Sequence, residues 1–359
     1  MKKSLKTFST LLVATALCFG IAVHDTPVAE AATNTKMIML YVGKHNSGSY
    51  YANYSTSDLN AMTGVSQFLI VPAGEWPVYT TGGTNNYDEI INGTSTNDGI
   101  VDLVAKIKAS NKANTPIWVS TPGMNSYSVP WTSMYLTNKN YLTKLQTALG
   151  TNWNSVNGIY YHCEYMYTAT SSTNFDFTNL MNNPSLKLAN DLSYYVHTTL
   201  DKKFIWAPFY SNVENQSTET VKRLAYTTNK TNIFDTVLVQ PGWYFNPVSS
   251  GAPQDNLNGV KYSVQKQTIT YRAGAEVVPR THFLATIGVQ MEIDEGISYS
   301  GDPRLSHYND YVTWFSPLRN TVASGKSENV PFGYYAGART GLFSYSNAVI
   351  NKINSFYNF

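Results

Sequence analysis

The sequence predicts a closed (β/α)8 barrel that occupies the chain after an N-terminal leader. Eight short runs rich in Val, Ile, Tyr and Phe recur along the sequence, and helical patterns separate most of them. Most runs are apolar at both odd and even positions, as expected of parallel strands that are covered on both faces. No Gly-x-Gly-x-x-Gly motif follows a run, which counts against an open dinucleotide-binding sheet.

The predicted strands cover residues 37–42, 67–71, 116–120, 156–164, 204–209, 235–240, 287–293 and 331–336. The helical patterns cover residues 98–110, 138–149, 185–200, 217–228, 260–273, 307–323 and 341–357. Between the first two strands, residues 57–62 predict only a capped turn or two. Alternation of strands and helices without a second composition regime favours a single barrel domain over residues 32–359.

Long loops follow several of the predicted strands, namely residues 43–56, 72–97, 121–137, 165–184 and 241–259. In a (β/α)8 barrel the loops after the strands build the face that carries the active site. Their length is therefore expected of an enzyme or a binding protein.

The N-terminus has the pattern of an export signal. Three lysines precede an apolar stretch over residues 8–23, and a small-x-small pattern ends at Ala31. We expect cleavage there, a signal peptide over residues 1–31, and a secreted extracellular protein. Because Leu17 precedes Cys18, the lipoprotein pattern is not met and no lipid anchor is expected.

The composition excludes several functional classes. Lys and Arg number 25 against 23 Asp and Glu, so no charge pattern suggests nucleic acid or an anionic membrane. After cleavage Cys163 is alone, which rules out an intramolecular disulfide and favours a buried apolar role over a thiol nucleophile. No Cys/His spacing fits zinc, so neither a metal nor a cofactor is expected. A monomer is expected.

The aromatic content favours contact with carbohydrate. The chain has 27 Tyr, 7 Trp and 15 Phe, while charged residues make up only 13%. Aromatic rings stack on the C–H faces of sugars, and amide and hydroxyl groups match sugar hydroxyls. A carbohydrate is therefore the expected partner.

The seventh predicted strand ends in a carboxylate. The odd positions within residues 289–293 are apolar, which assigns them to the side that packs against helices. Gln290, Glu292 and Asp294 are then expected to point toward the barrel axis. Barrel enzymes place catalytic groups at such strand ends.

The fourth predicted strand ends in a second carboxylate. By the same alternation Tyr160, His162 and Glu164 share the inner face, whereas Ile159 and Cys163 share the outer face. His162 could donate a hydrogen bond to Glu164 or could be a satisfied core histidine.

These two glutamates match the needs of glycoside hydrolysis. That reaction requires one protonated carboxyl to assist the leaving oxygen and one ionised carboxyl as nucleophile or base. Two glutamates reaching inward over a narrow mouth are expected to lie about 5 to 5.5 Å apart, the separation of retaining enzymes. Asp294 is the alternative second acid and would favour inversion. A structural alternative pairs the acids with one of three arginines, Arg280, Arg304 or Arg339.

Further side chains near the strand ends are candidates for substrate binding: Tyr41, Trp118, Tyr160, His162, Trp206, Tyr210, Gln240, Trp243, Tyr244, Gln290, Tyr334 and Tyr335. A core role is equally compatible with Trp118 and Trp206. Trp243 follows Pro241 and Gly242 in a loop, so sugar stacking is favoured for its ring over loop packing.

The arrangement resembles a large clan of retaining glycosidases with the acid/base on strand four and the nucleophile on strand seven. This resemblance implies that Glu164 is the proton donor and Glu292 the nucleophile. Cys163 departs from the clan, which usually has Asn before the acid. Residues 158–164, 239–245 and 288–294 also resemble, in order, motifs of a bacterial family catalogued as domain of unknown function four-eight-five-five. That resemblance implies a secreted barrel acting on carbohydrate.

Two functions remain in competition. The first is a glycoside hydrolase that acts on a polysaccharide or oligosaccharide, and the second is a carbohydrate-binding barrel without catalysis. An esterase or peptidase would require a Gly-x-Ser-x-Gly or His-Glu-x-x-His motif, and the sequence has neither. Clustered histidines, as in a metal-dependent deacetylase, are also absent from the sequence.

Overall fold

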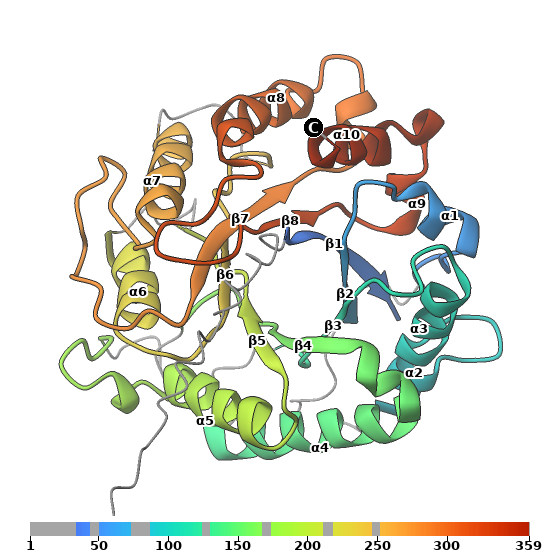
Figure 1. Ribbon diagram of the computed structural model, residues 1–359, viewed down its shortest axis with the longest axis horizontal. Helices are drawn as coiled ribbons and strands as arrows, with labels where there is room; N and C mark the ends of the chain where they lie inside the picture. The colour runs from blue at the N-terminus through green and yellow to red at the C-terminus, as the bar shows by residue number, and fades with distance from the viewer. Residues whose placement is uncertain are drawn as a thin grey trace, which may run out of the picture. The chain divides into compact units, whose positions relative to one another are not determined.

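Eight parallel strands close into a barrel in the computed structural model (Figure 1). Neighbours in the chain are neighbours in the barrel, and β8 pairs with β1 to close it. The strands are β1 (Lys36–Val42), β2 (Gln67–Pro72), β3 (Ile117–Ser120), β4 (Val156–Tyr161), β5 (Lys203–Trp206), β6 (Thr236–Val239), β7 (Thr286–Glu292) and β8 (Phe332–Tyr335). The predicted (β/α)8 fold is confirmed, with each strand within a few residues of its predicted range.

The structure describes residues 34–43, 50–72, 87–123, 130–166, 174–210, 218–245 and 252–358. The expected signal peptide and parts of the long loops lie outside these residues. Of the described helices, none is long and apolar enough to cross a bilayer.

Helices surround the strands in Figure 1. They are α1 (Thr56–Ala61), α2 (Tyr87–Asn92), α3 (Ile100–Ala109), α4 (Trp131–Leu149), α5 (Pro184–Thr198), α6 (Thr218–Asn229), α7 (Ala252–Lys266), α8 (Arg304–Phe315), α9 (Arg339–Leu342) and α10 (Ala348–Tyr357). Single 3-10 turns are η2 (Gly150–Ser155), η3 (Leu180–Asn182), η4 (Glu295–Ser298), η5 (Ser316–Leu318) and η6 (Tyr345–Asn347).

Prolines explain where several helix ends depart from prediction. Helix α4 begins at Trp131, directly after Pro130, rather than at residue 138. Helix α7 begins earlier than predicted, at Ala252. Pro253 does not prevent this, because the N–H that proline lacks would have no partner in the first turn of a helix. Helix α8 ends at Phe315 and the 3-10 turn η5 follows it, because Pro317 has no N–H to continue the α-helical hydrogen bonds.

The short helix α1 confirms the predicted capped turn. Ser55 and Asp58 form a capping box, in which each side chain accepts the backbone N–H of the other residue. Asp58 also binds the guanidinium of Arg339 at 2.9 Å. This ion pair links the β1–β2 connection to the loop after β8.

Two apolar layers form, as the strand alternation predicts. The inner core fills the barrel and contains Met37, Met39, Leu69, Val71, Trp118, Tyr160, Ile205, Ala207 and Leu238. The outer core lies between strands and helices and takes the alternate positions, such as Ile38 and Leu40 of β1. Beyond this inner core, polar residues that point inward lie at the carboxyl ends of the strands.

Trp118 fills the inner core below the mouth of the barrel. Its indole N–H donates to Gln67 at 2.7 Å. Gly158 on β4 is required there, since a Cβ at that position would lie 2.2 Å from the Trp118 ring. The ring is therefore part of the core, and the substrate contact considered for it is not supported.

Candidate active site

Glu292 is the last residue of β7 and is 4% exposed. Its neighbours Met291 and Ile293 belong to the outer core, so the predicted alternation along this strand is observed. The Glu292 carboxyl accepts a 2.5 Å hydrogen bond at Oε2 from the hydroxyl of Tyr311, which lies on α8. A buried carboxyl therefore stands at the carboxyl end of the seventh strand with a fixed donor beside it.

The hydroxyl of Tyr311 has a defined proton direction. It accepts the backbone N–H groups of Trp243 at 3.0 Å and Tyr244 at 3.2 Å. A phenolic hydroxyl has one proton and two acceptor positions, so with both positions filled its proton points to Glu292. This arrangement favours a Glu292 carboxylate as acceptor.

Glu164 lies three residues beyond the end of β4. Its carbonyl accepts the Phe209 N–H at 3.2 Å, which ties the segment to the end of the next strand. The side-chain amide of Gln240 donates to Glu164 Oε1 at 3.2 Å and to the Ala207 carbonyl at 2.6 Å. Gln240, one of the predicted site residues, is thus a positioning contact of the first acid.

The two carboxyls influence each other electrostatically. Burial raises the pKa of Glu164, and the Gln240 hydrogen bond opposes that shift. Burial raises the pKa of Glu292 to about 7, hydrogen bonds from Tyr311 and the Tyr244 backbone oppose the rise, and the charge of Glu164 adds to it. Because the charge of Glu164 raises the pKa of Glu292, the two carboxyls are coupled and titrate as a pair. We expected Glu292 to stay ionised, whereas burial of its carboxyl favours the protonated form.

Tyrosines surround the acids on the inner face. Tyr160 is buried, and its ring lies 5.6 Å from that of His162. Burial lowers the pKa of His162 to about 4, so its imidazole is neutral at the pH of most enzymes. Burial raises the pKa of Tyr335 to about 12, and the charges of Glu164 and Glu292 add to the rise. Tyr41 packs edge-on against Tyr335 at 5.9 Å.

A cavity of about 800 Å³ opens beside these tyrosines. We call it the mouth groove. It lies between the loops after β1, β7 and β8 and is lined by Tyr41, Tyr50, Tyr51, Ala52, Asn53, Asn97, Phe245, Asp294, Glu295, Tyr335, Gly337, Ala338, Thr340 and Gly341. Aromatic rings with interspersed amide groups give it the chemistry of a sugar-binding surface.

Several predicted substrate contacts lie in the outer core and not at the mouth. Trp206, Tyr210 and Tyr334 are each at most 1% exposed and pack between strands and helices. Their hydroxyl and indole groups are used internally, since Tyr210 donates to the Thr270 carbonyl and Trp206 to the Cys163 carbonyl. The structure therefore argues against substrate contact by these three rings.

Trp243 is also packed rather than open to a ligand. Its ring is 6% exposed and lies 4.6 Å from that of His307, and its indole N–H donates to Asp310 at 2.9 Å. Both partners belong to α8, which covers the loop after β6. Tyr244 is fully buried beside it. The expected stacking of Trp243 on sugar fails because a helix already covers the ring.

Asp294, the alternative acid, is committed to structure. Its Oδ2 binds Arg304 at 2.6 Å, and its Oδ1 accepts the Tyr244 hydroxyl at 2.8 Å and the Gly296 N–H at 2.9 Å. These three contacts tie the carboxyl to the loop after β7 rather than leaving it directed at a substrate. The predicted ion pairing with arginine therefore applies to Asp294 and not to the glutamates, since Arg339 pairs with Asp58 and Arg280 binds backbone carbonyls.

Two further predictions concern buried groups. Gln290 is 1% exposed below Glu292, and Gly333 provides the space for it, since a Cβ there would lie 2.2 Å from the Gln290 amide oxygen. Gln290 is placed in the barrel interior, beneath the acids.

Cys163 is buried in the outer core, and burial raises its pKa to about 12, which excludes a thiolate nucleophile. Across the described ranges no three His, Cys, Asp or Glu side chains gather as metal ligands.

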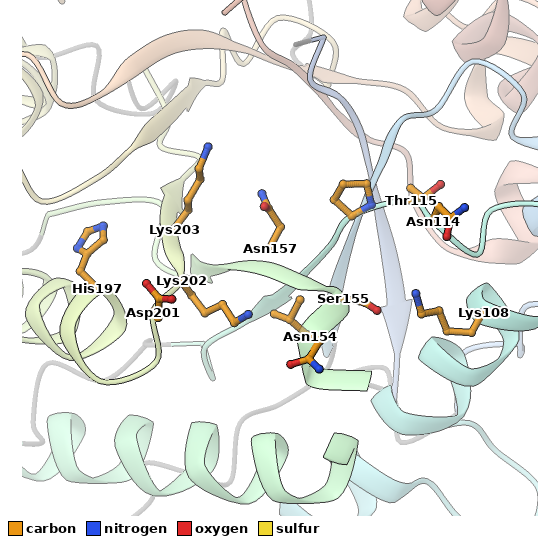
Figure 2. A pocket seen from close by; sticks show the side chains of 12 residues that line it. Lys108, Asn114, Thr115, Asn154, Ser155, Asn157, His197, Asp201, Lys202 and Lys203 are labelled. Carbon is orange, nitrogen blue, oxygen red and sulfur yellow. The ribbon is translucent and has the colours of Figure 1, made fainter. Parts of the chain in front are cut away.

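A second cavity, of about 690 Å³, lies at the opposite end of the barrel (Figure 2). Residues before or at the start of β3, β4 and β5 line it. Figure 2 shows Lys108 and Lys202 extending toward Ser155 from opposite sides. Because Glu164 and Glu292 lie at the carboxyl ends of the strands, this polar cavity is separate from the candidate active site.

Sequence reasoning missed Tyr311, Tyr50 and Tyr51. Tyr311 contacts Glu292 from a helix 19 residues away, and no local pattern distinguishes it from other buried tyrosines of α8. Tyr50 and Tyr51 lie in the loop after β1, where the adjacent pair of aromatic residues was an available signal.

No known protein family matches the chain by sequence, and no curated protein matches it. Solved structures of (β/α)8 glycoside hydrolases do resemble it. The GH5_18 protein from Streptomyces cattleya, solved in complex with GlcNAc, has 12% identity and a TM-score of 0.51, with 91% of this chain and 80% of that chain covered. This similarity shows the fold, and the predicted membership in a named family is not confirmed.

Two further solved structures match the chain with lower scores. A psychrophilic family 10 endo-β-1,4-xylanase has 9% identity, a TM-score of 0.47, and covers 90% of this chain and 96% of its own. A xylanase-α-amylase inhibitor protein in complex with trehalose has 13% identity and a TM-score of 0.45, and the match covers 89% of this chain and 96% of that chain.

Proposed function

We propose that this chain is a secreted glycoside hydrolase that cleaves a polysaccharide or oligosaccharide with Glu164 and Glu292. The observation that supports the proposal most directly is a pair of electrostatically coupled carboxyls, the half-buried Glu164 after β4 and the buried Glu292 at the end of β7, beside a tyrosine-lined groove. Coupling keeps one proton on the pair, which is the state that acid-assisted cleavage requires.

In this mechanism Glu164 donates its proton to the departing glycosidic oxygen. Glu292 attacks the anomeric carbon as the carbon–oxygen bond breaks, which forms a glycosyl ester. Glu164, now ionised, then removes a proton from water, and the hydroxide displaces Glu292 with a second inversion. The anomeric configuration is therefore retained.

The high pKa of Glu292 is compatible with a nucleophilic role once substrate is bound. Positive charge develops at the anomeric carbon in the transition state, and an ionised carboxylate next to it is strongly favoured. The shared proton then resides on Glu164. Tyr311 supports this distribution, because its hydroxyl proton points to Glu292 and stabilises the carboxylate form.

The test is release of reducing ends from a panel of soluble polysaccharides by the purified protein. Wild type is compared with Glu164→Gln and Glu292→Gln, which keep the side-chain shape but remove the titrating group. We expect turnover of at least one polymer by wild type and loss of most of it in both variants. Binding of a polymer without turnover by wild type would instead establish the non-catalytic carbohydrate-binding barrel.

A further inference from the structure

Two exposed tyrosines stand together on the loops that follow β7 and β8. Tyr299 directly follows η4 and is 41% exposed, and Tyr345 begins η6 and is 56% exposed. Their ring centroids are 5.5 Å apart and the ring planes are inclined by 80°. We call them the outer tyrosine pair. Packing of the core does not account for them, since both rings face solvent.

The backbone that presents Tyr345 is strained. Tyr345, Ser346 and Asn347 have consecutive φ angles of 48°, 58° and 63°. Residues other than glycine rarely adopt this left-handed backbone conformation, because their Cβ approaches the backbone carbonyl. These three residues in succession lie between the end of α9 and the start of α10. Strain of this kind is retained mainly where a surface has a binding or catalytic role.

Tyr299 packs against a charged network. Its ring lies 5.6 Å from the guanidinium of Arg304, which is bound by Asp302 at 2.5 Å and by Asp294 at 2.6 Å. The two carboxylates neutralise the arginine, so the network offers no free cation to a ligand. A ring that already packs against Arg304 and Tyr345 loses less conformational freedom on binding than a free one, which favours affinity.

The outer tyrosine pair lies a few residues along the chain from the lining of the mouth groove. Asp294 and Glu295 line the groove, and Tyr299 follows them after the single turn of η4. Gly341 also lines the groove, and Tyr345 lies four residues further along the chain. A Cβ at Gly341 would lie 2.2 Å from Glu295 Oε2, so these two loops are in direct contact at the groove.

We propose that the outer tyrosine pair is a separate binding site for uncharged sugar units of a long polysaccharide whose chain leaves the mouth groove. Sugar rings stack on the tyrosine faces by their C–H surfaces. The neutralised arginine and the adjacent Glu295 disfavour acidic sugars. This inference rests on the proposed function, in that the same polymer chain occupies the groove, but the site itself requires only binding.

The test measures retardation of the protein by polysaccharide in native gels. The probes are soluble β-mannan, xylan, β-galactan and glycol chitin, and all proteins carry Glu164→Gln so that no substrate is consumed. We expect at least one polymer to retard the parent, and Tyr345→Ala and Tyr299→Ala each to weaken that binding roughly ten-fold. Tyr345→Phe retains the ring and should bind like the parent.

Tyr194→Ala is the matched control, since Tyr194 is 71% exposed on α5, across the barrel from α10 in Figure 1. Retardation by none of the four polymers, or equal retardation of parent and alanine variants, would overturn the proposal. Thermal unfolding separates loss of binding from loss of folding, and Tyr299→Ala leaves the strained turn untouched. Binding that depends on the tyrosines in a wild-type protein without turnover would reject the hydrolase and retain this site.

Discussion

The hydroxyl of Tyr311 on α8 donates a 2.5 Å hydrogen bond to Glu292 at the end of β7. The same hydroxyl accepts two backbone N–H groups from the loop after β6. One helix residue therefore joins the loop and the carboxyl, and it favours the ionised form of Glu292.

Replacement of Tyr311 by Phe should shift the pH dependence of catalysis. The hydrogen bond from Tyr311 lowers the pKa of Glu292, so its loss raises that pKa further above 7. The alkaline limb of kcat/KM should then move to higher pH, and unpaired N–H groups should cost about 1–3 kcal/mol of stability. Tyr308→Phe is the control, since Tyr308 is buried on the same helix and bonds to Tyr334 instead. An identical shift in the control would contradict the assignment.

Wild-type activity should follow a bell-shaped pH profile. The first deprotonation of the coupled pair creates the working state, and the second, with an apparent pKa near 7, abolishes it. Initial rates between pH 4 and pH 9 on one polysaccharide provide the measurement. Activity that continues to rise above pH 8 would show that no protonated carboxyl is required.

Glu292→Gln should stabilise the protein at high pH. Because burial raises the pKa of Glu292 from 4.5 to about 7, the folded state binds a proton that the unfolded chain has released in this interval. Stability of wild type therefore falls as pH rises from about 4.5 to 7, by about 3 kcal/mol in total. Glu292→Gln lacks this pH-dependent loss of stability. Its free energy of unfolding, measured in urea, should therefore exceed that of wild type by more at pH 8 than at pH 4. A constant difference would refute the raised pKa.

Trp243→Ala should act on stability rather than on substrate binding. The ring is buried against His307 and its N–H binds Asp310, so truncation should cost about 3–5 kcal/mol. Denaturant unfolding measures the loss, and KM of the remaining folded protein should change little. An unaltered midpoint with a raised KM would restore the sugar-stacking role that the sequence suggested.

Asp294→Asn should leave the chemistry intact. The variant loses the charge that binds Arg304 and should cost about 2 kcal/mol, while kcat should stay within about ten-fold of wild type. Loss of kcat by several orders of magnitude, as expected for Glu164→Gln, would return Asp294 to the role of second acid.

The stereochemical outcome tests the two carboxyl roles. NMR of the first-formed product should show the retained anomer. Azide should rescue Glu164→Ala with a glycosyl azide of retained configuration, because anionic azide displaces Glu292 from the glycosyl ester without needing a base. It should rescue Glu292→Ala with an inverted glycosyl azide, because azide then attacks the anomeric carbon in place of Glu292. The inverted anomer from wild type would remove Glu292 as nucleophile even if Glu164 remained the acid.

The sequence by itself determined the barrel and the inward direction of the strand-end acids. Both follow from local periodicity, because successive side chains of a strand alternate between faces and the polar residues at 290 and 292 mark the inner face of β7. It also correctly favoured a buried, unreactive Cys163. These properties depend only on residues that are close in the chain.

The tertiary structure decided which aromatic rings are available to a ligand and which groups adjust the acids. Trp243 and Trp206 carry the same sequence signal as rings at the mouth, but helices cover them. Tyr311 reaches Glu292 from α8, and Asp294 is neutralised by Arg304. Alternation assigns a side chain to a face of its strand, whereas burial, hydrogen bonding and pKa depend on what another segment packs against that face.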